Sequence, residues 1–83
     1  MSGDVVARAT QVHEALPPAP NGFHWLTHVV ERDDKLTAEF GLAADGAQPG
    51  DRMAAYARID LELYGIAGVK ERAAALVAKV TKS

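Results

Sequence analysis

The sequence contains no cysteine, and none of its apolar runs approaches the roughly 20 residues that are needed to span a bilayer. Without cysteine, the chain can form no disulfide framework, no thiolate nucleophile and no cysteine-based zinc site. The first residues also lack the basic and apolar regions of a signal peptide. These absences predict a cytoplasmic protein with no membrane partner.

An excess of charge of one sign is also missing. Nine Lys and Arg residues against eleven Asp and Glu residues give a formal net charge of −2. This balance excludes a strongly basic protein that coats nucleic acids, and it excludes an acidic disordered tail. A folded domain is therefore expected.

Large apolar side chains are scarce. The hydrophobic fraction is 48 %, but 16 of these residues are alanine, and only 6 % of the chain is aromatic. Alanine buries little surface, so the few larger side chains must supply most of the core. A single small domain over residues 1–83 with so thin a core is marginal alone. We therefore expect it to bind a protein partner or a second copy of itself as a homodimer.

The first element expected is a helix over residues 4–16. Asp4 is a suitable N-cap, because its carboxylate can accept hydrogen bonds from free backbone amides. Apolar residues then recur at helical spacing, at Val5, Ala9, Val12 and Leu16. Prolines at 17 and 18 end the helix, and residues 17–22 form a stiff, proline-rich connector.

Residues 23–43 favour a β-hairpin. Apolar and polar residues alternate over 23–30 and again over 36–43, with a polar, turn-like segment at 31–35 between them. The alternative is a helix over about 22–32, because four apolar residues would then share one face: Trp25, Leu26, Val29 and Val30.

Turn-forming residues predict a loop over 44–50, followed by helices over 51–64 and 69–81. Asp51 is a suitable N-cap, and Gly65 suits the position just past a helix end. Asp60 lies close to the apolar side of the first helix and is expected to pair with Arg58 or another basic group. The predicted fold class is therefore α+β: helix, β-hairpin, helix and helix, with the hairpin packed against an antiparallel helix pair.

The sequence contains no recognisable catalytic, cofactor or metal site. Its serines stand only at positions 2 and 83, and its glycines form no nucleotide-binding motif. In a strand, His24 and His28 lie roughly 13 Å apart and cannot chelate one metal ion. In a helix they can, with Glu31 near the same face. Because the strand is favoured, we expect neither an enzyme nor a metal protein.

Positive charge is concentrated near the end of the sequence. Residues 66–83 carry a net charge of +3, whereas residues 1–34 carry −3 and residues 35–65 carry −2. Four basic residues supply this charge: Lys70, Arg72, Lys79 and Lys82. They are typical of a solvated helix face, and the alternative is a small phosphate-binding strip of a nucleic-acid-associated accessory protein.

The favoured function is a small protein-interaction module, an adaptor or inhibitor that acts by occupying a partner's surface. An unpaired hairpin edge invites strand addition by another chain. The small size and alanine-rich composition also suit an accessory protein of a phage or a bacterium. The residues expected to contact the partner are Trp25, His28, Val30, Phe40 and Leu42 in the hairpin, and Leu61 and Tyr64 near the end of the 51–64 helix.

Overall fold

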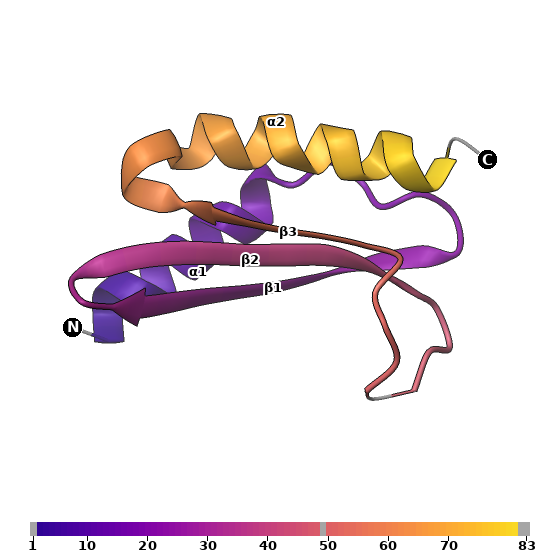
Figure 1. Cartoon of the computed structure of the whole chain (residues 1–83), viewed down its shortest axis with the longest axis horizontal. Coiled ribbons are helices and arrows are strands. Elements are labelled where there is room, and N and C mark those ends of the chain that lie inside the picture. Colours follow the sequence, from indigo (N-terminus) through magenta and orange to yellow (C-terminus); the bar gives the residue numbers. More distant parts are fainter. Residues whose placement is uncertain (1, 49, 82–83) are drawn as a thin grey trace.

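Three antiparallel strands form a sheet in the order β1-β2-β3, and both helices pack on one side of it (Figure 1). The computed structural model describes residues 2–48 and 50–81, without the side chains of residues 2–4. The elements are α1 (Ser2–Ala15), β1 (Phe23–Arg32), β2 (Lys35–Ala44), β3 (Ala55–Asp60) and α2 (Leu61–Thr81). The predicted α+β class is confirmed, but the described residues form two helices and three strands rather than three helices and a hairpin.

The predicted hairpin is confirmed, and the alternative helix over 22–32 is wrong. β1 and β2 pair from Phe23 with Ala44 to Arg32 with Lys35. The two turn residues, Asp33 and Asp34, have φ values of 55° and 63°. Two consecutive left-handed residues make the type of tight turn whose twist matches a hairpin, and Asp tolerates this conformation better than most residues.

The predicted helix over 51–64 is wrong for residues 51–60, and its last four residues are the start of α2. Residues 55–60 form β3, which pairs antiparallel with β2. The burial pattern alternates with a period of two: Ala55, Ala57 and Ile59 are buried, and Tyr56 and Arg58 are exposed. Residues of this segment fit a helical spacing as well as a strand spacing, and pairing with β2 decides between them. The loop is therefore longer than predicted.

Asp51, which was expected to cap a helix, and Asp60, which was expected to pair with a basic group, have other roles. Asp51 caps no helix, because its Oδ2 accepts a hydrogen bond from the backbone N–H of Gln48 at 2.8 Å within the loop. Asp60 is the N-cap of α2 instead: its Oδ1 accepts bonds from the N–H groups of Glu62 (2.9 Å) and Leu63 (3.1 Å). Arg58 does not pair with it, and lies 3.9 Å from Glu39 Oε2.

The predicted break at residues 65–68 between two helices is a kink inside α2. Gly65 has φ 66° and ψ −169°, which is outside helical geometry and is accessible essentially to glycine alone. The helix then continues to Thr81, so the predicted 69–81 helix is the second part of α2. The predicted antiparallel helix pair does not form, because this helix packs on β2 and β3. No helix in the described part of the chain is long and apolar enough to cross a membrane.

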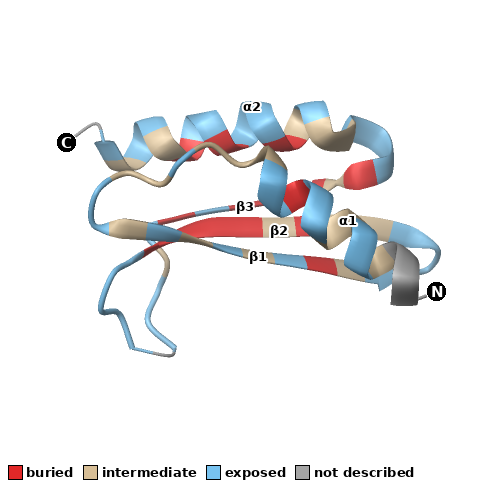
Figure 2. Cartoon of the chain, turned by 180° about the vertical axis from the view of Figure 1, so that it is seen from behind, coloured by how far each residue is buried: buried red, intermediate tan, exposed pale blue. Residues whose placement is uncertain are grey.

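The core lies between the sheet and the two helices (Figure 2). Side chains from every layer reach it, and the largest that are fully buried are Phe40, Leu42, Leu61, Val12 and Val69. Because both helices cover the same face, the opposite face of the sheet is covered by no helix of the described residues. This one-sided arrangement determines which side chains remain available to a partner.

Replacing Asp60 with alanine is expected to lower the free energy of unfolding by about 1 kcal/mol, because two amides in the first turn of α2 lose their acceptor. Urea denaturation followed by circular dichroism measures this loss. Asp60→Asn is the matched control, since its side-chain oxygen can still cap the helix. An Asp60→Ala variant as stable as the Asp60→Asn variant would contradict the capping role.

Candidate functional site

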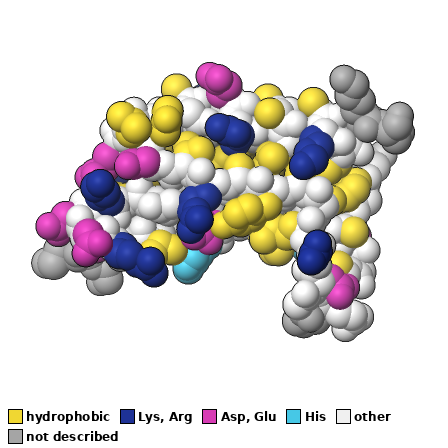
Figure 3. Space-filling view, viewed as in Figure 1, with side chains coloured by type: hydrophobic (Ala, Val, Ile, Leu, Met, Phe, Trp, Pro, Cys, Tyr) yellow, Lys and Arg dark blue, Asp and Glu magenta, His cyan; other side chains and the backbone are white. Residues whose placement is uncertain are grey.

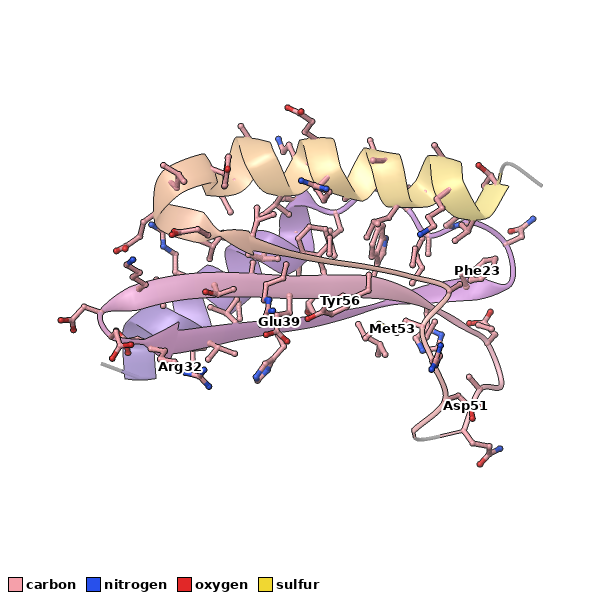
Figure 4. All side chains as sticks on the ribbon, viewed as in Figure 1. Phe23, Arg32, Glu39, Asp51, Met53 and Tyr56 are labelled. Carbon is pink, nitrogen blue, oxygen red and sulfur yellow. The ribbon has the colours of Figure 1, made fainter. Side chains whose placement is uncertain are left out.

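The face of the sheet that no described helix covers is called the outer face here. Strand alternation and the two registers assign its residues. They are His24, Leu26, His28, Val30 and Arg32 from β1, Thr37, Glu39, Gly41 and Ala43 from β2, and Tyr56, Arg58 and Asp60 from β3. In Figure 4, the labelled side chains of Glu39, Met53 and Tyr56 lie in front of the sheet, and α1 lies behind it.

Three apolar side chains gather on this face around the middle of the sheet. Leu26 is 45 % exposed and Tyr56 is 49 % exposed. Met53, from the loop before β3, lies over Gly41, where its sulfur occupies the space that a Cβ would take. These three residues, Leu26, Met53 and Tyr56, line a shallow depression of about 80 Å³ and are called the outer apolar cluster. The sheet therefore presents an apolar centre to solvent.

A second feature of the sheet is the edge of β1 that faces away from β2. Arg32 and Lys35 form the hydrogen-bonded pair that closes the two-residue turn. Counting back along β1 from Arg32, every second residue also exchanges backbone hydrogen bonds with its partner on β2. The intervening residues Trp25, Thr27 and Val29 therefore direct their N–H and C=O groups away from β2. No other strand of the described chain pairs with this edge.

Four of the seven predicted partner residues keep some exposure. His28 is exposed and Val30 half-buried, and both lie on the outer face. Trp25 is half-buried on the helix side, where its indole N–H donates to the Pro17 carbonyl at 2.6 Å. Tyr64 is 60 % exposed at the start of α2. The structure therefore brings together His28 and Val30 and places the other two elsewhere.

The remaining three predicted partner residues belong to the core. Phe40 and Leu42 are 0 % exposed, and Leu61 is 2 % exposed. Phe40 and Leu42 lie on the helix side of β2, and Leu61 turns inward at the first residue of α2. Sequence reasoning missed the outer apolar cluster instead. Leu26 stands in the alternating series that contains His24 and His28, which was interpreted as the polar side of the strand. Tyr56 was assigned to a helix.

The basic residues of α2 do not form one strip. Lys70, Arg72 and Lys79 are all exposed, and Lys82 lies outside the described residues. Arg72 and Lys79 are seven residues apart, about two helical turns, so they share a side of the helix. Lys70 is two residues from Arg72 and points about 200° away around the axis. The geometry therefore gives no continuous phosphate-binding surface on this helix.

The histidines do not form a metal centre with neighbouring ligands. His24 and His28 lie on a strand, and His24 Nδ1 is 2.8 Å from Asp45 Oδ1. Within residues 2–48 and 50–81, no group of three or more His, Asp or Glu side chains is placed to hold a metal ion. The helical geometry that would bring His24 and His28 together is absent from this segment.

Comparisons of the chain with protein-family models, with curated proteins and with solved structures found no match. The functional interpretation therefore depends on the outer face and on the two free edges of the sheet.

Proposed function

We propose that this protein is an interaction module, acting as an adaptor or inhibitor, that pairs an extended strand of a protein partner with the free edge of β1. The partner that we propose is a second copy of the chain, which makes the module a homodimer. One observation carries this proposal: β1 is an edge strand of ten residues, and no described strand pairs with its outer side along Trp25, Thr27 and Val29.

β1 lacks the features that usually protect an edge strand. Natural edge strands carry proline, bulges or inward-pointing charges that discourage pairing with another chain. β1 contains no proline and no glycine, and residues 25–30 contain no Asp, Glu, Lys or Arg. Its pairing with β2 runs through all ten residues without a bulge. An unprotected edge of this length supports strand addition.

The outer apolar cluster supports a second copy in particular. Two β1 edges that pair antiparallel around a two-fold axis join the sheets of both copies into one sheet of six strands. The same operation brings Leu26 of each copy close to the new strand boundary. Apolar side chains that are half-exposed in the monomer then lie against their equivalents, which adds buried apolar area to the backbone hydrogen bonds.

Replacing Thr27 with proline is expected to abolish this self-association and leave the domain folded. The N–H of Thr27 points to the free edge, so proline removes a donor from the new pairing and none from the pairing with β2. In a symmetric dimer the loss occurs twice, and the dissociation constant should rise about tenfold or more. Sedimentation velocity across a concentration series measures it, and circular dichroism reports the fold.

His28→Pro is the matched control, because the N–H of His28 faces β2. This variant should lose stability as a monomer, whereas Thr27→Pro should not. A wild-type protein that sediments as a monomer at every concentration would overturn the proposal of a homodimer. A Thr27→Pro variant that dimerises as tightly as the wild type would overturn the use of the β1 edge.

A further inference from the structure

The other edge of the sheet borders a groove. β3 is the last strand, and α2 runs back beside it (Figure 1). A shallow depression of about 270 Å³ lies between them. Its lining residues are Arg58, Ile59, Tyr64, Gly68, Glu71 and Arg72. We call this depression, together with the free edge of β3, the β3–α2 groove.

Two glycines determine the shape of the groove. Gly65 takes a left-handed φ of 66°, which turns the chain sharply after the first turn of α2. A Cβ on Gly68 would lie 2.5 Å from the Cβ of Tyr64, so only glycine lets that tyrosine pack so closely on the following turn. The Tyr64 ring remains 60 % exposed and lines the groove. The two glycines therefore fix the position of the Tyr64 ring at the end of the groove.

The backbone of β3 is available along this groove. Along β2, residues whose backbone hydrogen-bonds to β1 alternate with residues whose backbone hydrogen-bonds to β3. Ala38 and Phe40 belong to the second group, and they are paired with Ile59 and Ala57 of β3. The N–H and C=O groups of the intervening residue, Arg58, then point to the free edge, and those of Tyr56 do the same. No strand within the described residues occupies this edge. An added strand would find unpaired donors and acceptors there.

Positive charge lines the groove. Arg58 and Arg72 both border it, and the Arg58 side chain is 64 % exposed, with its Glu39 partner at a long 3.9 Å. None of the ion pairs among the described residues involves Arg72. In Figure 3, Lys and Arg side chains lie between hydrophobic ones over α2 and β3, and the end of the molecule with the β1–β2 turn carries both acidic and basic side chains.

We propose that the β3–α2 groove binds an extended peptide with acidic side chains, which adds to β3 as a fourth strand and places its carboxylates beside Arg58 and Arg72. Main-chain pairing supplies affinity in this mode of recognition, and alternate side chains supply specificity. The free strand edge favours a peptide over a nucleic acid, because a phosphate can accept hydrogen bonds from the N–H groups of the edge but has no donor for its C=O groups.

The probe for this proposal is a labelled octapeptide of paired glutamates and valines (Glu-Glu-Val-Val, repeated once) with blocked ends, which directs glutamates to both faces of an added strand. Fluorescence anisotropy measures its binding to the full chain. We expect binding at low salt that weakens in 0.5 M salt. The corresponding lysine–valine peptide should not bind. A glutamate–valine peptide in which every backbone amide is N-methylated should also fail to bind, because neither of its edges can donate hydrogen bonds to β3.

Arg72→Ala is expected to weaken peptide binding about five-fold, the loss of one partly exposed charge pair. Lys70→Ala is the matched control, because it removes the same charge from another side of α2 and should leave binding unchanged. Thr27→Pro should also bind the peptide normally, since it alters the opposite edge. Failure of this proposal is thereby distinguishable from failure of the β1 homodimer.

Three results would overturn the inference. The first is no binding of the glutamate–valine peptide at low salt, and the second is equal binding by the Arg72→Ala and wild-type proteins. The third is binding of the N-methylated peptide as tight as that of the parent, which would exclude strand addition. A duplex DNA probe that binds more tightly than the peptide and depends on Arg72 would also overturn it, and would assign the groove to nucleic acid.

Discussion

Replacing Phe40 with alanine is expected to lower the free energy of unfolding by about 3–5 kcal/mol, the usual loss for a fully buried phenylalanine. Phe40 is 0 % exposed on the central strand, and its ring meets that of Trp25 edge-on at a centroid distance of 6.3 Å. A chain of this length has about 4–12 kcal/mol of total stability. The expected loss is therefore between about a quarter of that total and all of it. Urea denaturation followed by circular dichroism measures the change in midpoint.

Tyr56→Ala is the control for this prediction. Tyr56 lies on the neighbouring strand, but on the outer face, where it is 49 % exposed. The same type of truncation should cost less than about 1 kcal/mol there, because a half-exposed side chain leaves no sealed cavity. Similar losses for Phe40→Ala and Tyr56→Ala would contradict a sheet with one covered face and one open face.

Local sequence was sufficient to predict the hairpin. Both strands show a period of two, and Asp33 and Asp34 provide a polar turn whose residues tolerate a positive φ. Each of these signals lies within about twenty residues of chain. The competing helix over 22–32 would have used the same apolar residues, but it would have left β2 with β3 as its one neighbouring strand in the described sheet.

β3 could not be predicted in the same way, because the pairing that stabilises it is not local. Ala55 and Ala57 belong to the residue type with the highest helix propensity, and the strand has only six residues. Their pairing with Leu42 and Phe40 crosses a ten-residue loop. Tertiary packing therefore overrides propensity here, and the helix starts only after this strand, with Asp60 rather than Asp51 as its N-cap.

The same non-local information decides which predicted site residues are accessible. The sequence indicates that Phe40 and Leu42 share one face of the hairpin, but it does not indicate which face the helices cover. Once β3 and α2 are placed, that face is the core, and the outer apolar cluster takes the exposed position. Tyr64 remains exposed in either case, because it lies at a chain reversal built on Gly65.

The two edges of the sheet differ in chemistry, and this difference separates the two proposals. Residues 25–30 on β1 are free of Asp, Glu, Lys and Arg, whereas the groove along β3 contains Arg58 and Arg72. An acidic strand gains nothing electrostatically at β1, and a copy of β1 carries no acidic side chain in that stretch to match the arginines at β3. Specificity is a difference between affinities, so each edge favours its own partner.

Replacing Gly41 with valine is expected to destabilise the sheet by about 3 kcal/mol, at the upper end of the usual range for overpacking. Gly41 lies in the middle of β2, on the outer face, opposite Leu26 on one side and Tyr56 on the other. A Cβ at this position would lie 2.6 Å from the carbonyl oxygen of Ala55, and it would also meet the sulfur of Met53. The carbonyl belongs to the backbone of β3 and cannot move without breaking the pairing with β2.

A double variant separates the two obstacles. Met53 is a flexible side chain that can move away, so adding Met53→Ala to Gly41→Val removes one contact and leaves the contact with the Ala55 carbonyl. If the carbonyl is the main obstacle, the double variant should recover little of the lost stability in urea denaturation. Full recovery would show that the methionine alone limits the site. In that case the outer apolar cluster, rather than the close approach of two strands, would be the reason for glycine at position 41.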